Sequence, residues 1–248
     1  MRIIFRTSSH KHNKIKLKIS PLDCLKNLKK VFNKTDITVV GDNITKSQVE
    51  KYEKIVGKKN FIEINLKNNS KSLKYCIDLV LGFQKSKNFK KISNENELVY
   101  FVENDYLHKM NSKKNLIDAF NLNIHYVSLY DHPDYYDNLK KFTDFRQVLD
   151  NPEKKVLKGK YSHWVTASST TCTFAVKKKI LLEDYSYFKK MCKRDIPRDH
   201  KIFTQLTNKG RLLISPIPSL ATHFTNINSV YGLSPNVNWK KLWEDNES

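Results

Sequence analysis

The hydrophobic and polar positions in the first hundred residues follow two alternating patterns. Short apolar runs rich in β-branched and aromatic residues end in polar residues, and they predict strands at 3–5, 36–42, 60–65 and 98–102. Between them, apolar residues recur at helical spacing and predict helices over 20–32, 47–56 and 70–83. Strands that alternate with helices predict an α/β fold, in which helices flank a mainly parallel central sheet.

The rest of the chain has a more mixed pattern. Apolar runs and helical periodicity predict strands at 126–130, 171–176 and 211–214, and helices over 180–192 and 199–208. A proline-punctuated segment, 215–218, follows the last of these strands. Because no linker, internal repeat or low-complexity block interrupts the pattern, we expect 1–248 to form a single domain.

Polar residues follow several of the predicted strands in the first half. The polar segment 7–9 follows the first strand, Asp42 ends the second, and Glu103 and Asp105 follow the fourth. In parallel α/β sheets, ligands bind outside the carboxyl ends of the strands. We therefore expect these residues to share one ligand site.

Glu103 and Asp105 are the strongest candidates for chemistry in this group. They are separated by one residue, so both side chains can face the same cation. Carboxylate oxygens suit Mg²⁺ or Mn²⁺, which can bridge the two phosphates of a nucleotide-sugar and stabilise a departing diphosphate. An acid-x-acid pair alone also occurs on solvated turns, and its position after a buried strand is what favours a metal site here.

Two residues of the second half are further candidates. His223 follows the proline-punctuated segment and is either a metal ligand or a surface or capping histidine. Asp199 stands at the start of a predicted helix. An aspartate there is either an N-cap or a general base that accepts the proton of an incoming sugar hydroxyl.

Several side chains near the later strands carry groups that hydrogen-bond to sugars or stack on them. The same residues would also fit packed turns, so their assignment to a donor or acceptor sugar is a hypothesis. They are Asp131, His132, Trp164, Thr170 and Thr171.

The composition narrows the class of protein only modestly. The net charge is +20, which is typical of proteins that bind nucleic acid or anionic membranes, but the Lys residues are spread along the whole chain and accompany an excess of Asn and Ile. The four cysteines form no CxxC motif, so we expect buried free thiols. No signal-peptide core or membrane-length apolar run is present, which predicts a soluble, cytoplasmic protein.

Other enzyme classes lack support in the sequence. The chain contains no Gly-rich dinucleotide fingerprint, no phosphate-binding P-loop and no G-x-S-x-G nucleophile elbow.

Taken together, several sequence blocks resemble a known family. The chain resembles GT-A fold glycosyltransferases, in particular a group of small bacterial and viral members. The blocks occur in the expected order and span nearly the whole chain, at 99–108, 126–136, 163–175, 198–203, 212–223 and 233–239.

The resemblance implies an enzyme that transfers a sugar from a UDP-, GDP- or dTDP-linked donor to a glycan or lipid-linked acceptor, with Mn²⁺ or Mg²⁺ as cofactor. It implies a nucleotide-binding half at 1–105 and an acceptor and catalytic half at 106–243. It also implies a single in-line displacement that inverts the anomeric carbon. No nucleic-acid partner is expected, while the charge is consistent with peripheral association with an anionic membrane.

The resemblance also implies roles for individual residues. Asp105 matches the main metal ligand, helped by His223 and Glu103, and Asp199 matches the catalytic base of inverting members. The positions that match nucleotide contacts are Arg6, Thr7, Asp42, Glu103 and Asn104. The chain has Glu-Asn-Asp where related sequences tend to have Glu-Asp-Asp, so we expect Asn104 to weaken metal binding or to leave it mainly to Asp105.

Two alternatives remain open at this point. A nucleotidyltransferase that makes nucleotide-sugars would use similar substrates, although the segment after the first strand, 7–12, contains none of the glycines of its phosphate loop. A basic nucleic-acid-binding protein without catalysis would show salt-sensitive binding to any DNA or RNA.

Overall fold

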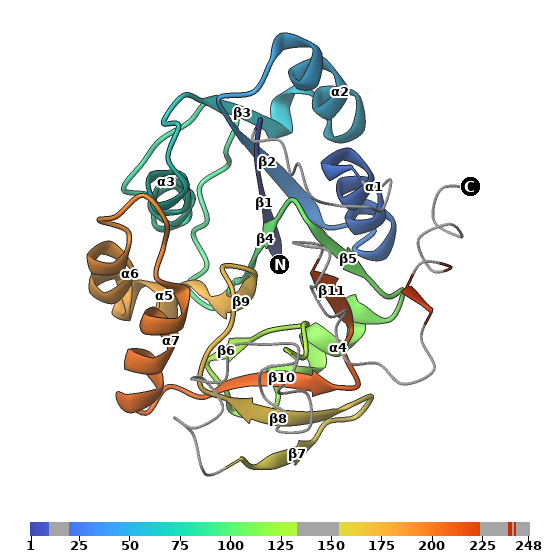
Figure 1. Cartoon of the computed structure of the whole chain (residues 1–248), viewed down its shortest axis with the longest axis vertical. Coiled ribbons are helices and arrows are strands. Elements are labelled where there is room, and N and C mark those ends of the chain that lie inside the picture. Colours follow the sequence, from blue (N-terminus) through green and yellow to red (C-terminus); the bar gives the residue numbers. More distant parts are fainter. Residues whose placement is uncertain (10–19, 133–153, 224–237, 240, 242–248) are drawn as a thin grey trace, which may run out of the picture.

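The computed structural model describes residues 1–9, 20–132, 154–223, 238, 239 and 241. Its described strands form a nine-stranded sheet and a separate two-stranded sheet (Figure 1). In spatial order, the large sheet consists of β3 (Phe61–Ile64), β2 (Asp36–Asp42), β1 (Arg2–Ser8), β4 (Leu98–Glu103), β9 (Phe174–Lys177), β6 (Tyr126–Val127), β10 (Leu213–Ile217), β8 (His163–Ala167) and β7 (Val156–Lys158).

The first half of the chain builds the parallel part of the large sheet. β1 pairs in parallel with β2 and β4, and β2 pairs in parallel with β3. Beyond β4 the pairing is mixed, because β9 runs antiparallel to both β4 and β6, whereas β10 is parallel to β6 and antiparallel to β8. The predicted α/β fold with a central sheet flanked by helices is confirmed, and its parallel pairing is concentrated in the first half.

Local signals at the helix ends explain why the crossover helices form where they do. Ser20 and Thr45 each form a capping box with the residue three positions later, and the Asn68 side chain accepts a hydrogen bond from the backbone of Lys71. Gly82 ends its helix in the left-handed conformation. The helices are α1 (Pro21–Val31), α2 (Lys46–Val56), α3 (Asn69–Leu81), α4 (Ser112–Ala119), α5 (Lys178–Glu183), α6 (Tyr185–Met191) and α7 (Asp199–Asn208), with a short 3₁₀ turn, η1 (Lys58–Asn60).

Two hydrophobic cores cover the two faces of the sheet. Along β1, Ile3 and Phe5 point into the core that includes α1, while Ile4 points into the core that includes α3, α6 and α7. This alternation follows the two-residue period of a strand, and Figure 1 shows α1 and α3 on opposite sides of β1. No helix among the described residues is long and apolar enough to cross a membrane.

The structure corrects the prediction of one helix over 180–192. The segment forms two helices that break at Asp184, whose side chain is fully buried. Its carboxylate accepts hydrogen bonds from the Tyr126 hydroxyl at 2.8 Å and from Arg211 Nε at 2.8 Å, and it pairs with Lys209 at 3.0 Å. These contacts with distant residues fix the break, and no local sequence signal marks it.

Other differences concern strands of the second half. The strand predicted at 211–214 lies at Leu213–Ile217 and includes Pro216, where β10 pairs with β8 but no longer with β6. The strands predicted at 126–130 and 171–176 lie at Tyr126–Val127 and Phe174–Lys177. The pattern did not predict α4, β7, β8, or the two strands of the small sheet, β5 (Tyr106–His108) and β11 (Ala221–His223).

Acid should destabilise the protein through His108, which is fully buried on β5. Its Nε2 lies 2.7 Å from the Tyr100 hydroxyl, and burial lowers its pKa from 6.5 to about 3. Because the unfolded chain takes up this proton at higher pH than the folded chain, the contribution to stability is complete above 6.5 and is lost as the pH falls toward 3. At about pH 5 we expect a loss of roughly 2 kcal/mol, at 1.4 kcal/mol per pH unit.

The measurement is urea unfolding of the wild type and of His108→Gln over a range of pH. The wild type should lose more stability than the variant between about pH 7 and pH 5, where other buried groups contribute equally to both. Parallel pH profiles for the two proteins would show that His108 does not control the acid response.

Candidate functional site

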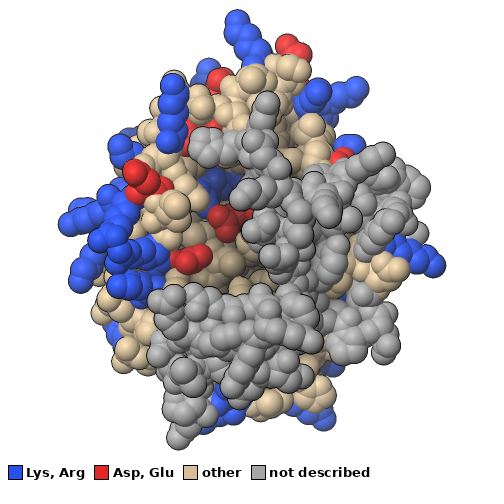
Figure 2. Space-filling model, in the orientation of Figure 1, with Lys and Arg blue, Asp and Glu red and all other residues tan. Residues whose placement is uncertain are grey.

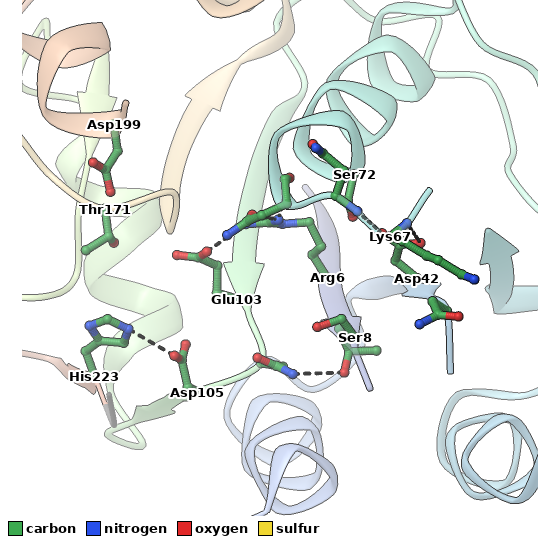
Figure 3. Close-up of a pocket in the computed structure, with 15 residues that line it drawn as sticks. Arg6, Ser8, Asp42, Lys67, Ser72, Glu103, Asp105, Thr171, Asp199 and His223 are labelled. Carbon is green, nitrogen blue, oxygen red and sulfur yellow. Dashed lines mark hydrogen bonds and ion pairs between the residues drawn. The ribbon is translucent and has the colours of Figure 1, made fainter. Parts of the chain in front are cut away.

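A cavity of about 320 Å³ opens at the carboxyl ends of β1, β2 and β4, where the sequence predicted a ligand site (Figure 3). Parallel strands place their following loops at one edge of the sheet, which explains why residues far apart in the sequence meet here. The lining residues are Arg6, Thr7, Ser8, Asp42, Asn43, Lys67, Asn68, Asn69, Ser72, Glu103, Asn104, Asp105, Thr171, Asp199 and His223.

Asp105 and His223 form a carboxylate–imidazole pair at one side of the cavity. His223 Nε2 lies 3.0 Å from Asp105 Oδ2, and both residues belong to or adjoin the small two-stranded sheet (Figure 3). The pairing of β11 with β5 sets His223 opposite Tyr106, the residue directly after Asp105. Two residues separated by 118 positions in the sequence are thus held in hydrogen-bonding contact.

Buried aromatic rings hold the His223 ring in place. The Tyr106 ring stacks on it with centroids 4.6 Å apart, and the Tyr106 hydroxyl lies 2.6 Å from Thr171 Oγ1. Burial acts to lower the pKa of His223, but the Asp105 charge and hydrogen bond, with the charge of Glu103, outweigh it and raise the pKa.

Glu103 is held by an arginine in the middle of the cavity wall. Arg6 Nη2 donates to Glu103 Oε1 at 2.6 Å, and Arg6 Nη1 donates to the Asn69 carbonyl at 3.0 Å. The Glu103 backbone N–H donates to Thr173 Oγ1 at 3.0 Å. Burial raises the pKa of Glu103 against the opposing charge of Arg6. Because its carboxylate pairs with Arg6, Glu103 is better placed to position Arg6 than to act as the predicted metal ligand.

Asn104 joins a short chain of buried side chains. Its Nδ2 donates to Thr7 Oγ1 at 3.0 Å, and Thr7 Oγ1 lies 2.8 Å from the Tyr52 hydroxyl. Burial raises the pKa of Tyr52 to about 12. These contacts tie the turn after β4 to the end of β1 and to α2, so Asn104 supports the cavity wall through its amide.

Asp42 organises the loop that precedes α3. Its Oδ1 accepts hydrogen bonds from the backbone N–H groups of Leu66 and Lys67 at 2.7 and 3.1 Å, and Oδ2 accepts one from Asn68 at 3.4 Å. Lys67 has a positive φ of 49°. Asp42, which the sequence predicted to contact the nucleotide, therefore lines the cavity. Its carboxylate also fixes the loop that carries Lys67 and Asn68.

Asp199 reaches the cavity from the first turn of α7. Its Oδ1 accepts a hydrogen bond from the His200 backbone N–H at 2.7 Å. Burial raises the pKa of the Asp199 carboxyl, against the effects of that hydrogen bond and of the His200 charge. Figure 3 shows Asp199, Thr171, His223 and Asp105 on the same side of the cavity. A carboxylate with a raised pKa in this position has the properties of a general base.

The remaining candidate sugar contacts lie away from the cavity lining. Trp164 is fully buried on β8 in the core that includes α1, and Thr170 is buried. Asp131 is buried and its backbone N–H donates to Ser219 Oγ at 2.9 Å. The His132 ring packs edge-on against Tyr130, which in turn contacts the His223 ring. Of the five candidate sugar contacts, only Thr171 lines the cavity.

Sequence reasoning missed the cavity residues contributed by the loop after β3 and the start of α3. These residues follow a parallel strand, so the same rule that selected Asp42 would have selected them. The residues not predicted are Lys67, Asn68, Asn69 and Ser72, together with Asn43, which follows β2. The sequence blocks at 126–136 and 233–239 lie partly outside the described residues.

Comparisons with known proteins give structural matches without sequence matches. No family model and no curated protein matches the chain. A Bacillus anthracis protein assigned as a glucose-1-phosphate thymidylyltransferase, solved with sucrose, is similar with a TM-score of 0.53 and 14% identity, over 92% of this chain and 91% of that one.

Two weaker structural matches fall below a TM-score of 0.5. S. aureus TarS 1-349 matches with a TM-score of 0.47 and 14% identity over 87% of this chain, which spans 58% of that fragment. A nucleotidyl transferase from Methanothermobacter matches with a TM-score of 0.46 and 8% identity, over 100% of this chain and 98% of that one. The Bacillus anthracis match carries the conclusion, which concerns the fold alone: the chain has the predicted Rossmann-like, GT-A-type α/β fold.

Proposed function

We propose that the protein is a metal-dependent glycosyltransferase, which moves a sugar from a nucleotide-sugar to a hydroxyl group of a glycan or lipid-linked acceptor. The observation that carries this proposal is the convergence of Asp199 and the Asp105–His223 pair in one cavity. The half-buried carboxylate of Asp199, whose pKa is raised, supplies a base, and the pair supplies ligands for a cation. The cavity volume of about 320 Å³ lies in the range of small-molecule sites.

The donor set at Asp105 and His223 fits a divalent cation. Among the described residues no group of three His, Cys, Asp or Glu side chains comes together. Such a site suits a cation that completes its shell with water and substrate phosphate oxygens, as Mg²⁺ and Mn²⁺ do. Because one of the two ligands is an imidazole nitrogen, Mn²⁺ suits the pair better than Mg²⁺. When bound, the cation supplies positive charge for the leaving diphosphate.

The residues of the chain itself account for the other requirements of the transfer. Asp199 accepts the proton of the acceptor hydroxyl while the hydroxyl oxygen attacks the anomeric carbon of the donor sugar. Arg6, held by Glu103 and Asn69, presents a fixed positive charge in the cavity wall beside the leaving group. The attack and the departure occur on opposite faces of the sugar, so the proposal includes inversion at the anomeric carbon.

A donor-turnover screen tests the proposal. UDP-, GDP- and dTDP-sugars are each incubated with the protein in Mn²⁺ or in EDTA, and release of the nucleoside diphosphate is measured. We expect at least one donor to be hydrolysed slowly with Mn²⁺ and none in EDTA.

A second arm of the screen tests the nucleotidyltransferase alternative. Nucleoside triphosphates are supplied with sugar 1-phosphates, and pyrophosphate is measured. Pyrophosphate release, with no turnover of any nucleotide-sugar, would replace the glycosyltransferase proposal with that alternative.

A further inference from the structure

The loop between α6 and α7 forms a basic rim on the Asp199 side of the cavity. We define the rim as residues 193–198, which connect the end of α6 to Asp199 at the start of α7. Lys193, Arg194 and Ile196 in it are exposed, and Arg198 is half-exposed. Ile196 is 71% exposed, the largest fraction among the large hydrophobic residues in the described part of the chain.

The rim is fixed to the cavity wall by hydrogen bonds. The Ser70 backbone N–H donates to the Asp195 carbonyl at 3.1 Å, and Asn68 Nδ2 donates to Asp195 Oδ1 at 2.7 Å. Pro197, directly after Ile196, is buried. Ile196 is therefore exposed on a loop that is anchored to the cavity wall. The one acidic side chain of this loop, Asp195, accepts a hydrogen bond from Asn68.

More basic side chains surround the rim. Lys189 and Lys190 at the end of α6, Lys71 on α3 and Lys201 on α7 are exposed. Figure 2 shows Lys and Arg side chains gathered over the part of the molecule where Figure 1 places α3 and α6, next to acidic side chains in the middle of the same face. In the described part of the chain, Lys193, Arg194 and Arg198 form no ion pair with a carboxylate.

We propose that the rim docks on an anionic lipid bilayer, and that it thereby presents a lipid-linked acceptor to Asp199. A surface that binds only a soluble polyanion needs positive charge alone, whereas an exposed aliphatic side chain within a basic surface is typical of interfacial membrane binding. Ile196 would enter the boundary between headgroups and acyl chains, while the basic side chains contact lipid phosphates. The role in acceptor delivery rests on the proposed glycosyltransferase function, but the docking itself does not.

Vesicle sedimentation of the full chain tests the docking without any assay of activity. The probes are vesicles of phosphatidylcholine alone and of phosphatidylcholine mixed with phosphatidylglycerol. We expect binding to the mixed vesicles only. Lys193→Gln with Arg194→Gln should weaken it by about 25-fold, at about fivefold per charge, and Ile196→Ser by about tenfold.

The matched control removes two adjacent exposed charges elsewhere, in Lys58→Gln with Lys59→Gln on η1, and should leave vesicle binding unchanged. An equal loss of vesicle binding in the control and rim variants would overturn the proposal. It would also be overturned if soluble polyphosphate displaced the protein from the vesicles and Ile196→Ser did not weaken binding. Mn²⁺-dependent donor hydrolysis measured without vesicles should be the same in the rim variants and the wild type. A failure of docking is thereby distinguished from a failure of the proposed function.

Discussion

Replacing Asp199 with asparagine should lower kcat for sugar transfer by roughly 10²–10⁴-fold, the usual contribution of a general base. The substitution keeps the size of the side chain and an oxygen that can accept the hydrogen bond from the His200 backbone. Binding of the donor and of Mn²⁺ should change little, because the proposed ligands of the cation are Asp105 and His223 and not Asp199. The measurement is steady-state transfer to a saturating acceptor, with the donor KM determined in parallel.

Asp195→Asn is the matched control for Asp199→Asn. Asp195 lies four residues earlier, in the loop that precedes α7, is exposed, and does not line the cavity. An asparagine at 195 can still accept the hydrogen bond from Asn68. Near wild-type turnover by Asp199→Asn, or product of retained anomeric configuration by NMR, would remove Asp199 from the role of base.

Replacing Asp105 with alanine should abolish the metal dependence of turnover and lower the rate by roughly 10³-fold, since a catalytic cation contributes several kcal/mol to the transition state. The variant also leaves the imidazole of His223 without its partner at 3.0 Å. The measurement is donor turnover as a function of Mn²⁺ concentration.

Asp36→Ala, which removes a carboxylate on the exposed start of β2, is the control and should behave as the wild type. If Asp105→Ala keeps the Mn²⁺ response of the wild type, the cation binds elsewhere.

The sequence predicts the first half of the fold well because its signals are local. Each crossover helix begins at a capping residue such as Ser20 or Thr45, and the apolar runs between the helices have the composition of buried strands. The alternation then leaves few topologies, because parallel strands need crossover helices.

The second half depends on contacts between distant residues, which a local pattern cannot reveal. β5 and β11 have three residues each, too few to show a strand period, and they form only by pairing with each other. The break between α5 and α6 depends on Asp184, which is held by residues from β6 and the segment before β10.

Part of the candidate site was predictable because it lies on the parallel strands of the first half. The rule that ligands lie at the carboxyl ends of parallel strands places Asp42, Glu103 and Asp105 at one edge, and the structure confirms that arrangement. The position of His223 beside Asp105 followed only from the family resemblance, because 118 residues separate them. For Trp164, the residue type suggested sugar stacking, but the pairing of β8 with β10 places its side chain in the core.

Roles within the site depend on hydrogen bonds that a sequence does not display. Asp42 lines the cavity, and its carboxylate also accepts hydrogen bonds from three backbone N–H groups of the loop that precedes α3. Glu103 has the spacing of a metal ligand, yet Arg6 pairs with it at 2.6 Å.

Stabilisation of the wild-type protein by nucleoside diphosphates tests the central claim most directly. Tm is measured with UDP, GDP and dTDP, each with Mn²⁺ and with EDTA. At a ligand concentration about 100 times Kd, we expect one of the three to raise Tm by roughly 5–10 °C with Mn²⁺ and to have little effect in EDTA. An equal rise in EDTA, or no rise with any nucleotide, would contradict a metal-dependent nucleotide-sugar site in this cavity.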